Sequence, residues 1–205
     1  MRILTLDAAL AICSAGLVVD GALLAAREAR DAQAALPSMV QQMFSECGRA
    51  IDMVAVTVGP GSFTGLRSAL ALAHGIGLAA GVPVLGVTVG AAMARLTRPG
   101  RQFWAAIDSK RAGRIFLERS GAIVSLDLSA LPSPEGPVAV AGDAAIAVAS
   151  RLAAREVDVQ LLEARRPVPL GIALAAIGGE TRPAQPLYVD LPEARPGRSG
   201  RPAPA

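Results

Sequence analysis

Short apolar runs alternate with stretches of helical periodicity along this chain, and their order predicts an α/β protein. Three apolar runs open the sequence, each rich in strand-forming side chains and bounded by turn residues. They predict strands at 2–6, 12–19 and 22–28. Asp20-Gly21 separates the last two runs and is typical of a type I′ turn, so these strands are expected to form a hairpin.

A helical stripe follows from about Ala32 to Cys47. Its apolar positions recur every three or four residues, as expected for one buried face of a helix. Proline has no N–H to donate and is tolerated only in the first turn. Pro37 therefore leads us to expect that the regular helix starts near Leu36 or a little earlier.

A glycine loop between a strand and a helix is the most distinctive stretch. Residues 53–58 are apolar and β-branched, and Gly59-Pro60-Gly61 ends that run. Ser62 and Thr64 are both favourable N-caps for a helix that is expected from Gly65 to about Ala80. Free N–H groups at such a helix start suit either an anion or a tightly packed loop. The spacing fits no standard phosphate motif, because no lysine follows and Gly65 comes one residue late for a dinucleotide fingerprint.

The opening pattern recurs later in the chain. After a strand at 82–87 and a helix through about Leu96, residues 102–126 again read as strand, aspartate, strand, glycine turn and strand. Asp108 ends the first strand of this copy, as Asp7 ends the first strand of the chain. The repeat predicts two related half-domains.

The element order of each half is that of a ribonuclease-H-like half-domain, and its duplication is the architecture of the actin and sugar-kinase superfamily. We expect an N-terminal half at 1–100 and a reduced C-terminal half at 101–192. For the second half the remaining pattern predicts a loop at 131–137, a strand at 138–141, a helix from Asp143 as cap to about Arg155, a strand at 157–162 and a helix at 169–177.

Composition supports a globular chain, with 52% apolar and 18% charged residues among 205. Aromatic residues are scarce at 3%, so the core must pack through alanine, glycine and close backbone approach. The net charge is +3, but Arg195, Arg198 and Arg201 lie in a Pro- and Gly-rich end. Residues 193–205 are therefore expected to be a disordered basic tail. The rest is near neutral, which argues against a dedicated nucleic-acid platform.

Residues 68–94 carry no formal charge apart from a histidine, which raises the question of a membrane span. Several glycines and Pro83 interrupt the run, so a buried helix, a turn and a buried strand fit better. We expect a soluble, cytoplasmic chain without a membrane partner.

Candidate chemistry centres on Asp7, Asp108 and the glycine loop. As the ends of equivalent strands, the two carboxylates would face each other across a cleft between the halves. The full candidate set for a nucleotide is Asp7, Gly59, Pro60, Gly61, Ser62, Phe63, Thr64, Gly65, Arg67 and Asp108. Related phosphate loops place glycine two residues after the aspartate, where this chain has Ala9 and Lys110, so capping or turn roles are favoured for both aspartates.

Groups for hydrolytic catalysis are missing from the sequence. His74 is the single histidine, so no histidine pair or triad exists, and a packing or interface role is expected for it. Ser62 lacks the Gly-x-Ser-x-Gly pattern of a nucleophile elbow. We therefore expect no catalytic residue and no metal site.

The first two helices carry more apolar surface than one sheet face requires, which predicts a helix-bundle interface of about 1,000 Å² or more. The expected interface residues are Leu36, Met39, Val40, Met43, Phe44, Leu66, Ala69, Leu70, Ala73, His74 and Gly77. A charge in this stripe, as in Ala73→Glu or Met43→Glu, is expected to abolish pairing and leave the monomer folded.

The segments 59–67, 2–7 and 11–14 together resemble the TsaB (YeaZ) family, whose members assist bacterial synthesis of threonylcarbamoyladenosine on tRNA. The resemblance is specific at 59–67, extends over about the first 110 residues and is weak afterwards. Residues 187–189 resemble the family's short closing strand. The resemblance implies the actin-like fold named above.

The resemblance also implies partners. Family members pair through their first two helices, with themselves or with a TsaD-like protein that holds the metal and the chemistry. With a TsaE-like ATPase, that pair transfers threonylcarbamoyl to adenosine 37 of ANN-decoding tRNAs, so contact with tRNA would be indirect. No cofactor of its own is implied, and ATP or ADP at the TsaD-like boundary stays open.

Two departures from the family pattern affect expected ligand contacts. Asp31-Ala32 stands where the family has a histidine followed by Ser or Thr, and Arg114 replaces an acidic residue of the second-half motif. Neither affects the helical surface. Two other functions remain open at this point, a small ATPase or kinase using Asp7 and the 59–65 loop, and a peptidase.

Overall fold

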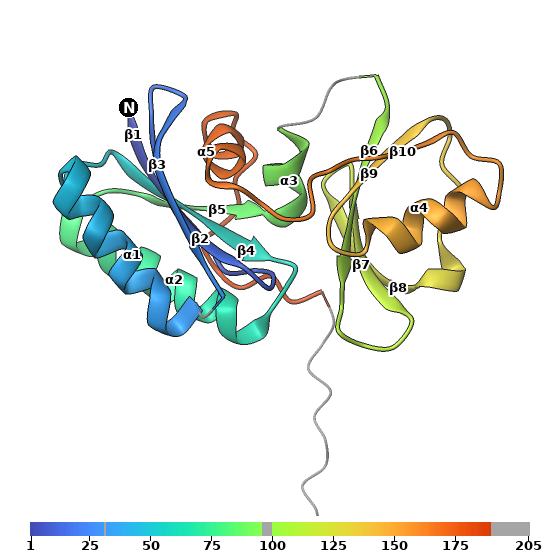
Figure 1. Ribbon diagram of the computed structural model, residues 1–205, viewed down its shortest axis with the longest axis horizontal. Coiled ribbons are helices and arrows are strands. Elements are labelled where there is room, and N and C mark those ends of the chain that lie inside the picture. The colour runs from blue at the N-terminus through green and yellow to red at the C-terminus, as the bar shows by residue number, and fades with distance from the viewer. Residues whose placement is uncertain (31, 96–99, 190–205) are drawn as a thin grey trace, which may run out of the picture.

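The computed structural model describes residues 1–30, 32–95 and 100–189 of the chain, arranged as two halves that each contain a five-stranded mixed sheet (Figure 1). The first sheet has the order β3-β2-β1-β4-β5. Its strands are β1 (Arg2–Asp7), β2 (Cys13–Val19), β3 (Ala22–Ala29), β4 (Met53–Gly59) and β5 (Val84–Thr88). β1 pairs antiparallel with β2 and parallel with β4, as the strand order of a ribonuclease-H-like half requires.

The second sheet repeats this topology with the order β10-β9-β6-β7-β8. Its strands are β6 (Gln102–Asp108), β7 (Arg114–Arg119), β8 (Ala122–Asp127), β9 (Val138–Ala141) and β10 (Val159–Leu161). β6 occupies the place of β1, antiparallel to β7 and parallel to β9. The duplicated actin and sugar-kinase-like architecture expected from the repeat is therefore confirmed.

The equivalent hairpins use the same turn chemistry. Asp20 and Gly21 have φ angles of 50° and 80°, and Ser120 and Gly121 have φ angles of 49° and 77°. Two successive positive φ angles define the type I′ turn, whose twist matches that of the flanking strands. The hairpin predicted from Asp20-Gly21 is confirmed, and the repeat extends to the turn.

The second half is smaller because its counterpart of the first helix is missing. In the first half α1 (Ala32–Cys47) connects the third and fourth strands, whereas η1 (Leu128–Ala130), a single turn of 3-10 helix, lies at the equivalent place. The crossover helices that follow are α2 (Phe63–Ala80) in the first half and α4 (Ala145–Ala153) in the second. The predicted reduction of the second half is therefore visible in its helices.

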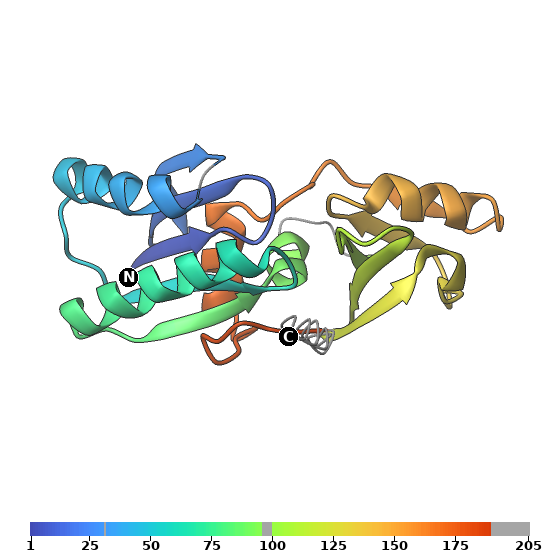
Figure 2. The same ribbon diagram turned by 90° about the horizontal axis from the view of Figure 1, so that it is seen from below.

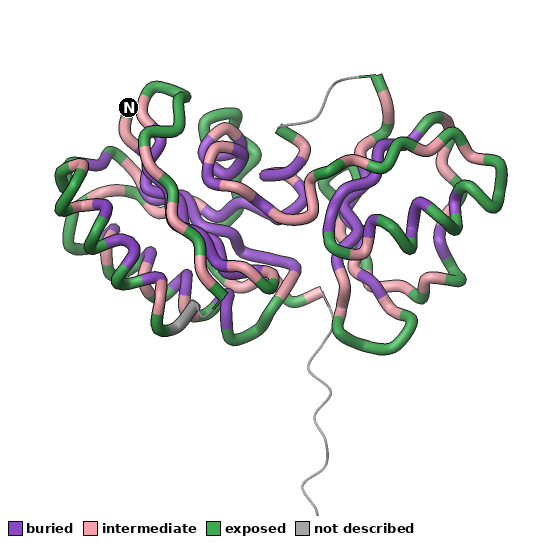
Figure 3. The backbone as a smooth tube through the Cα atoms, viewed as in Figure 1, coloured by how far each residue is buried: buried purple, intermediate pink, exposed green. Residues whose placement is uncertain are grey.

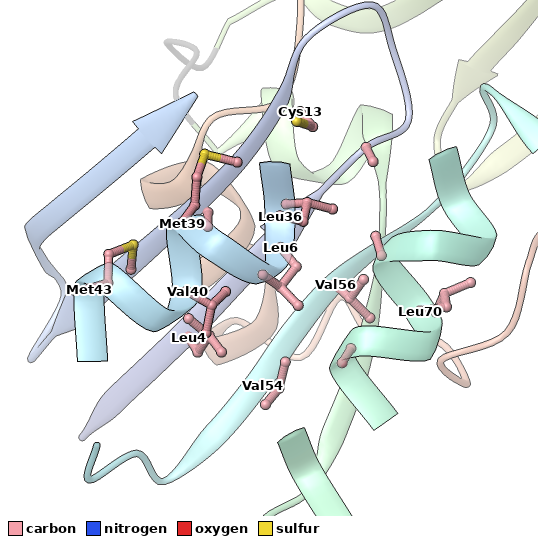
Figure 4. Close-up of a cluster of buried hydrophobic side chains, with 14 of the residues drawn as sticks. Leu4, Leu6, Cys13, Leu36, Met39, Val40, Met43, Val54, Val56 and Leu70 are labelled. Carbon is pink, nitrogen blue, oxygen red and sulfur yellow. The ribbon is translucent and has the colours of Figure 1, made fainter. Parts of the chain in front are cut away.

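Helices cover both faces of the first sheet. α1 and α2 lie side by side over one face, where Leu4, Leu6, Val54 and Val56 of the sheet meet Leu36, Met39, Val40, Met43 and Leu70 (Figure 4). The other face is covered by α3 (Val89–Ala94) and by α5 (Pro169–Ile177), whose Ile172 packs with Ile3 and Val18. α5 follows β10 in sequence yet packs on the first sheet, so the chain crosses back between the halves (Figures 1 and 2).

Several expected boundaries differ from the observed ones. α1 starts at Ala32 and contains Pro37 in its second turn, so the expectation of a start near Leu36 is wrong. Asp143 does not cap α4, because Ala144 is the N-cap residue and the Asp143 carboxylate instead accepts the Asp108 N–H. Residues 187–189 form no strand. Asp31, Leu96 and the predicted tail at 193–205 lie outside the described residues.

The apolar stripes of α1 and α2 point inward. Met43 and Ala73 are fully buried, so the expectation that a glutamate at either position leaves the monomer folded has to be corrected. Figure 3 shows the same division, with buried positions in the strands and on the inner sides of the helices and exposed positions on the outer sides.

We expect Met43→Glu to lower the free energy of unfolding by at least about 3 kcal/mol, because it places an unpaired carboxylate in the core. Gln42→Glu is the matched control, since Gln42 is exposed in the same helix. The measurement is urea denaturation of both variants. Wild-type stability of Met43→Glu would contradict the packing of α1.

Candidate functional site

Two aspartates occupy equivalent positions at the carboxyl ends of β1 and β6. The Asp7 carboxylate accepts the N–H of Ala9 at 3.1 Å, and the Asp108 carboxylate accepts the N–H of Lys110 at 2.7 Å. Each aspartate thus bridges to the backbone two residues ahead, the local pattern of an Asx turn. Both side chains therefore have the turn role that the sequence favoured for them.

Their surroundings nevertheless differ. Asp7 is buried and also accepts the Thr57 hydroxyl at 2.5 Å, while its Oδ2 has no hydrogen-bond partner among the described residues. Burial, opposed by these hydrogen bonds, raises the pKa of Asp7 from 3.8 to about 6. Asp7 lies below the surface and does not line the space between the halves.

Asp108 is partly exposed and forms an ion pair. Lys110 Nζ lies 2.8 Å from Asp108 Oδ2 and 3.6 Å from Asp143 Oδ2. The hydrogen bond from the Lys110 ammonium lowers the pKa of Asp108 below its usual value, and the Lys110 N–H adds to that shift. The two aspartates therefore do not form the facing pair that was expected from the repeat.

The glycine loop is packed against the chain itself. A Cβ on Gly61 would lie 2.2 Å from the Ala9 carbonyl oxygen, and a Cβ on Gly65 would lie 2.1 Å from that of Ala8. The Ser62 N–H donates to the Ala9 carbonyl at 2.7 Å. Of the two roles left open for this loop, close packing is the one that these contacts support.

Of the two expected caps, Ser62 and Thr64, it is Ser62 that caps α2, and the helix starts at Phe63, before the expected Gly65. The Ser62 hydroxyl oxygen accepts the Gly65 N–H at 3.2 Å, which satisfies one of the free donors of the first helical turn. Ser62 Oγ is thereby used in a cap, and no histidine lies beside it, since His74 is bonded elsewhere. The described residues contain no group of three or more His, Cys, Asp or Glu side chains that could hold a metal ion.

A cleft of about 690 Å³ lies between the two halves, beside the glycine loop. The loop lines it through Pro60, Gly61, Ser62 and Phe63, and the segment after β6 lines it through Asp108, Ser109, Lys110 and Arg111. Of the candidate nucleotide set, Pro60, Gly61, Ser62, Phe63 and Asp108 line the cleft, whereas Asp7 and Gly65 are buried and do not line it.

An aromatic cluster stands at this cleft. The guanidinium carbon of Arg67 lies 3.7 Å from the centre of the Phe63 ring. Arg67 also donates to the Tyr188 hydroxyl at 3.1 and 3.0 Å, and the two rings are 5.9 Å apart. No sequence pattern predicts this contact between α2 and residue 188, because the contact depends on how an irregular segment returns to the first half. Leu187 anchors that segment by donating to the Val58 carbonyl at 2.8 Å.

Most residues of the expected helical interface are buried inside this chain. Nine of the eleven are buried, namely Leu36, Met39, Val40, Met43, Leu66, Ala69, Leu70, Ala73 and Gly77. Phe44 is half-buried. His74 is exposed, and its Nε2 lies 2.8 Å from the Ala184 carbonyl oxygen, so it holds the returning C-terminal segment.

One buried acid was missed from the sequence. Glu118 of β7 accepts the Thr88 hydroxyl and, at 2.8 Å, the N–H of Gly90 at the start of α3. Burial raises the pKa of Glu118. Glu118 thus joins the second sheet to the first half. The one sequence feature that could have pointed to this role is the presence of a glutamate within an otherwise apolar strand.

Comparison with known proteins gives consistent matches. The family model for TsaD, tRNA N6-adenosine threonylcarbamoyltransferase, matches residues 26–130. The tRNA threonylcarbamoyladenosine biosynthesis protein TsaB of Escherichia coli is 39% identical over 101 residues, which cover 46% of this chain and 43% of that protein. An uncharacterized protein of Mycobacterium tuberculosis is 29% identical over 214 residues, covering 95% of this chain and 94% of that protein.

Solved structures show the same fold. YeaZ from Pseudomonas aeruginosa superposes with a TM-score of 0.73 at 24% identity, covering 91% of this chain and 99% of that one. A Pseudomonas aeruginosa protein described as similar to peptidase YEAZ gives the same TM-score of 0.73, covering 92% and 99%. In addition, no helix among the described residues is long and apolar enough to cross a membrane.

Gly61→Ala should destabilise the protein by about 1 to 3 kcal/mol, because its methyl group meets the Ala9 carbonyl and the loop must shift. Gly75→Ala is the matched control: nothing lies within 4 Å of the added Cβ, and alanine is the better helix former. Thermal denaturation compares the two. Equal melting temperatures for both variants would rule out the packing role of the loop.

The buried carboxyl of Asp7 predicts a pH dependence of stability. Its pKa is higher in the folded state, at about 6, than its ordinary value of 3.8, so the stability that this group contributes is present below pH 3.8 and is lost as the pH rises through about 6. Relative to wild type, Asp7→Asn should gain about 2 to 3 kcal/mol between about pH 4 and 7.5. Urea denaturation across that range tests it, and a constant difference would refute it.

Proposed function

This chain belongs to the TsaD family as a member of the TsaB (YeaZ) type, and from this premise we propose that it is a non-catalytic, cytoplasmic partner of a TsaD-like protein. Family membership supports a role in tRNA threonylcarbamoyladenosine modification. The proposed complex, with a TsaE-like ATPase, transfers a threonylcarbamoyl group to N6 of adenosine 37 in ANN-decoding tRNAs. The reactive groups are then supplied by the partner.

The observation that carries this proposal is the outer surface of α2 from residue 68 to residue 80, where the sequence has no Asp, Glu, Lys or Arg. Ala71, Gly75 and Ala79 are exposed at four-residue steps, and Leu78 is 88% exposed. Small residues at this spacing allow another helix to approach closely, and an exposed leucine supplies apolar area to bury. The inner side of α2 is occupied by the core, so the outer side is the surface available to a partner.

α1 continues this surface. The sequence has no Asp, Glu, Lys or Arg between residues 32 and 45, nor between residues 68 and 80. Among the residues of this range whose burial is described, the exposed positions of α1 are Ala34, Pro37, Ser38, Gln41, Gln42 and Ser45. Burying such a surface desolvates no charge, and two helices side by side offer enough length for an interface of about 1,000 Å² or more.

The geometry of the site favours an accessory role over a catalytic one. A phosphate loop would need backbone open to the ligand beside Asp7, but the Gly61 and Ser62 backbone packs against Ala9 there. This favours the accessory role over the small ATPase or kinase. A peptidase would need a nucleophile with a base, and the hydroxyl of Ser62 serves as a helix cap.

The same surface would serve a homodimer. A self-paired interface is isologous and uses one patch twice, so it competes with a TsaD-like partner for α1 and α2. The proposal includes ATP or ADP bound at the boundary with that partner. Such a nucleotide would be a ligand of the complex and not of this chain alone.

Gly75→Glu and Leu78→Glu should weaken pairing with the TsaD-like protein by about 30-fold or more, because each places an unpaired carboxylate in the interface. Gly75 has open space around it and Leu78 is exposed, so the monomer should keep its fold. Co-purification and titration calorimetry measure the pairing.

Ala147→Glu is the matched control, because Ala147 is an exposed helical residue of α4 in the other half. It should pair as wild type does. Unchanged pairing of both α2 variants, with the melting temperature unaltered, would contradict this interface. Light scattering of the isolated chain at high concentration tests the homodimer in the same series.

A further inference from the structure

Arg67 lies on the same side of α2 as the surface proposed for pairing. Eleven residues make about three turns of an α-helix, so Arg67 and Leu78 point in nearly the same direction, about 16 Å apart along the axis. Ala71 lies between them on that side, and all three residues are exposed. The outer surface of α2, which carries no charged residue from 68 to 80, therefore meets one cation at its N-terminal end.

The side chain of Arg67 is ordered but forms no ion pair. Its guanidinium carbon lies 3.7 Å from the centre of the Phe63 ring, and its Nε and Nη2 donate to the Tyr188 hydroxyl at 3.1 and 3.0 Å. Within residues 1–30, 32–95 and 100–189, no carboxylate is paired with it. A guanidinium has five N–H donors, so Arg67 keeps donors for a further acceptor, and little rotamer entropy remains to be lost on binding one.

A second copy of this chain offers Arg67 no acid from the same surface. An isologous interface through α1 and α2 uses one patch of both copies. Neither residues 32–45 nor residues 68–80 contain an aspartate or a glutamate. Glu46 follows directly in α1, but its carboxylate is paired with Arg27. Self-pairing would therefore cover a cation that has no carboxylate to meet it.

We propose that Arg67 binds a carboxylate of the TsaD-like partner, and that this contact favours the heterodimer over self-pairing. The inference rests on the proposed function and adds to it the residue that distinguishes the two kinds of partner. An arginine takes a carboxylate through two parallel N–H bonds, which fixes orientation as well as affinity. Covering the same cation without an acid costs free energy, so one side chain supports one pairing and opposes the other.

A carboxylate of the partner fits Arg67 better than the phosphates of a nucleotide do. Phosphate groups bind where several backbone N–H groups converge on them. In the loop beside Arg67, the Ser62 N–H donates to the Ala9 carbonyl and the Gly65 N–H donates to the Ser62 hydroxyl. A single ordered guanidinium without such a cradle suits one acidic side chain.

The test compares Arg67→Gln with wild type by titration calorimetry against the TsaD-like protein, at low and at high salt. The variant should pair about 5- to 30-fold more weakly at low salt, between the loss of an exposed ion pair and that of an arginine anchor. Its pairing should also depend less on salt, because one attraction between opposite charges is gone. Arg151→Gln is the matched control, since it removes an exposed arginine from α4, and it should pair as wild type does.

Two further measurements separate the charge of Arg67 from a purely structural role. Light scattering of the isolated chain follows self-pairing, which Arg67→Gln should not weaken. Tyr188→Phe removes the hydroxyl that accepts from Arg67 but leaves the cation, so its pairing with the TsaD-like protein should keep the salt dependence of wild type. A melting temperature for each variant distinguishes loss of pairing from loss of fold.

Four results would overturn the inference. They are equal heterodimer affinity of wild type and Arg67→Gln, an unchanged salt dependence, equal weakening of self-pairing, and an effect that appears only with ATP or ADP present, which would assign the guanidinium to a phosphate. Wild-type pairing of Arg67→Gln together with disruption by Leu78→Glu refutes this inference and leaves the proposed function standing. Absence of pairing by the wild type itself contradicts both.

Discussion

The contact on which this structure depends is that between the glycine loop and the backbone after β1. At Gly61 and Gly65 there is no room for a side chain, because the carbonyl oxygens of Ala9 and Ala8 would lie only 2.2 and 2.1 Å from an added Cβ. Close approach of two backbones, with the Ser62 N–H donating to Ala9, joins β4 and the start of α2 to the end of β1. The direction of α2 follows, and with it the placement of its inner face on the core and its outer face in solvent. In a chain with few large side chains, such backbone contacts take the place of bulky anchors.

The same contact determines what the site can do. Where the actin and sugar-kinase fold brings two strand ends together, this chain closes the first with its own loop and buries Asp7 beneath it. The carboxyl then faces Thr57 and the Ala9 N–H, and burial raises its pKa. At the second strand end the loop after β9 packs at Gly142 against the Ala106 carbonyl, but Asp108 stays partly exposed and pairs with Lys110. A duplicated fold has thus kept the position of both aspartates while giving each a different environment.

Periodicity and turn chemistry predicted most of the fold, because they are local. The type I′ turns at Asp20-Gly21 and Ser120-Gly121 mark the repeat, and α5 begins at Pro169, where a fixed φ suits the first helical position. Which face of α1 and α2 is buried was not local information. Residues 32–45 and 68–80 carry no Asp, Glu, Lys or Arg on either face, and the sheet beneath decides which face is inside. The position of Tyr188 was harder still, since it depends on a segment without regular structure that is held by His74 and Val58.

The geometry of α2 separates the cleft from the outer surface proposed for pairing. Phe63 and Arg67 are at its first turns, beside the cleft, while Gly75 and Leu78 are near its end. At 1.5 Å per residue, Phe63 and Leu78 are roughly 22 Å apart along the helix axis, with Arg67 between them. Both surfaces belong to one straight, well-packed element whose N-terminus is fixed by the Ser62 cap and whose C-terminus ends at Gly81 in the left-handed conformation. A partner helix packed on the outer surface near the end of α2 would therefore be held at a set distance from the cleft beside its start.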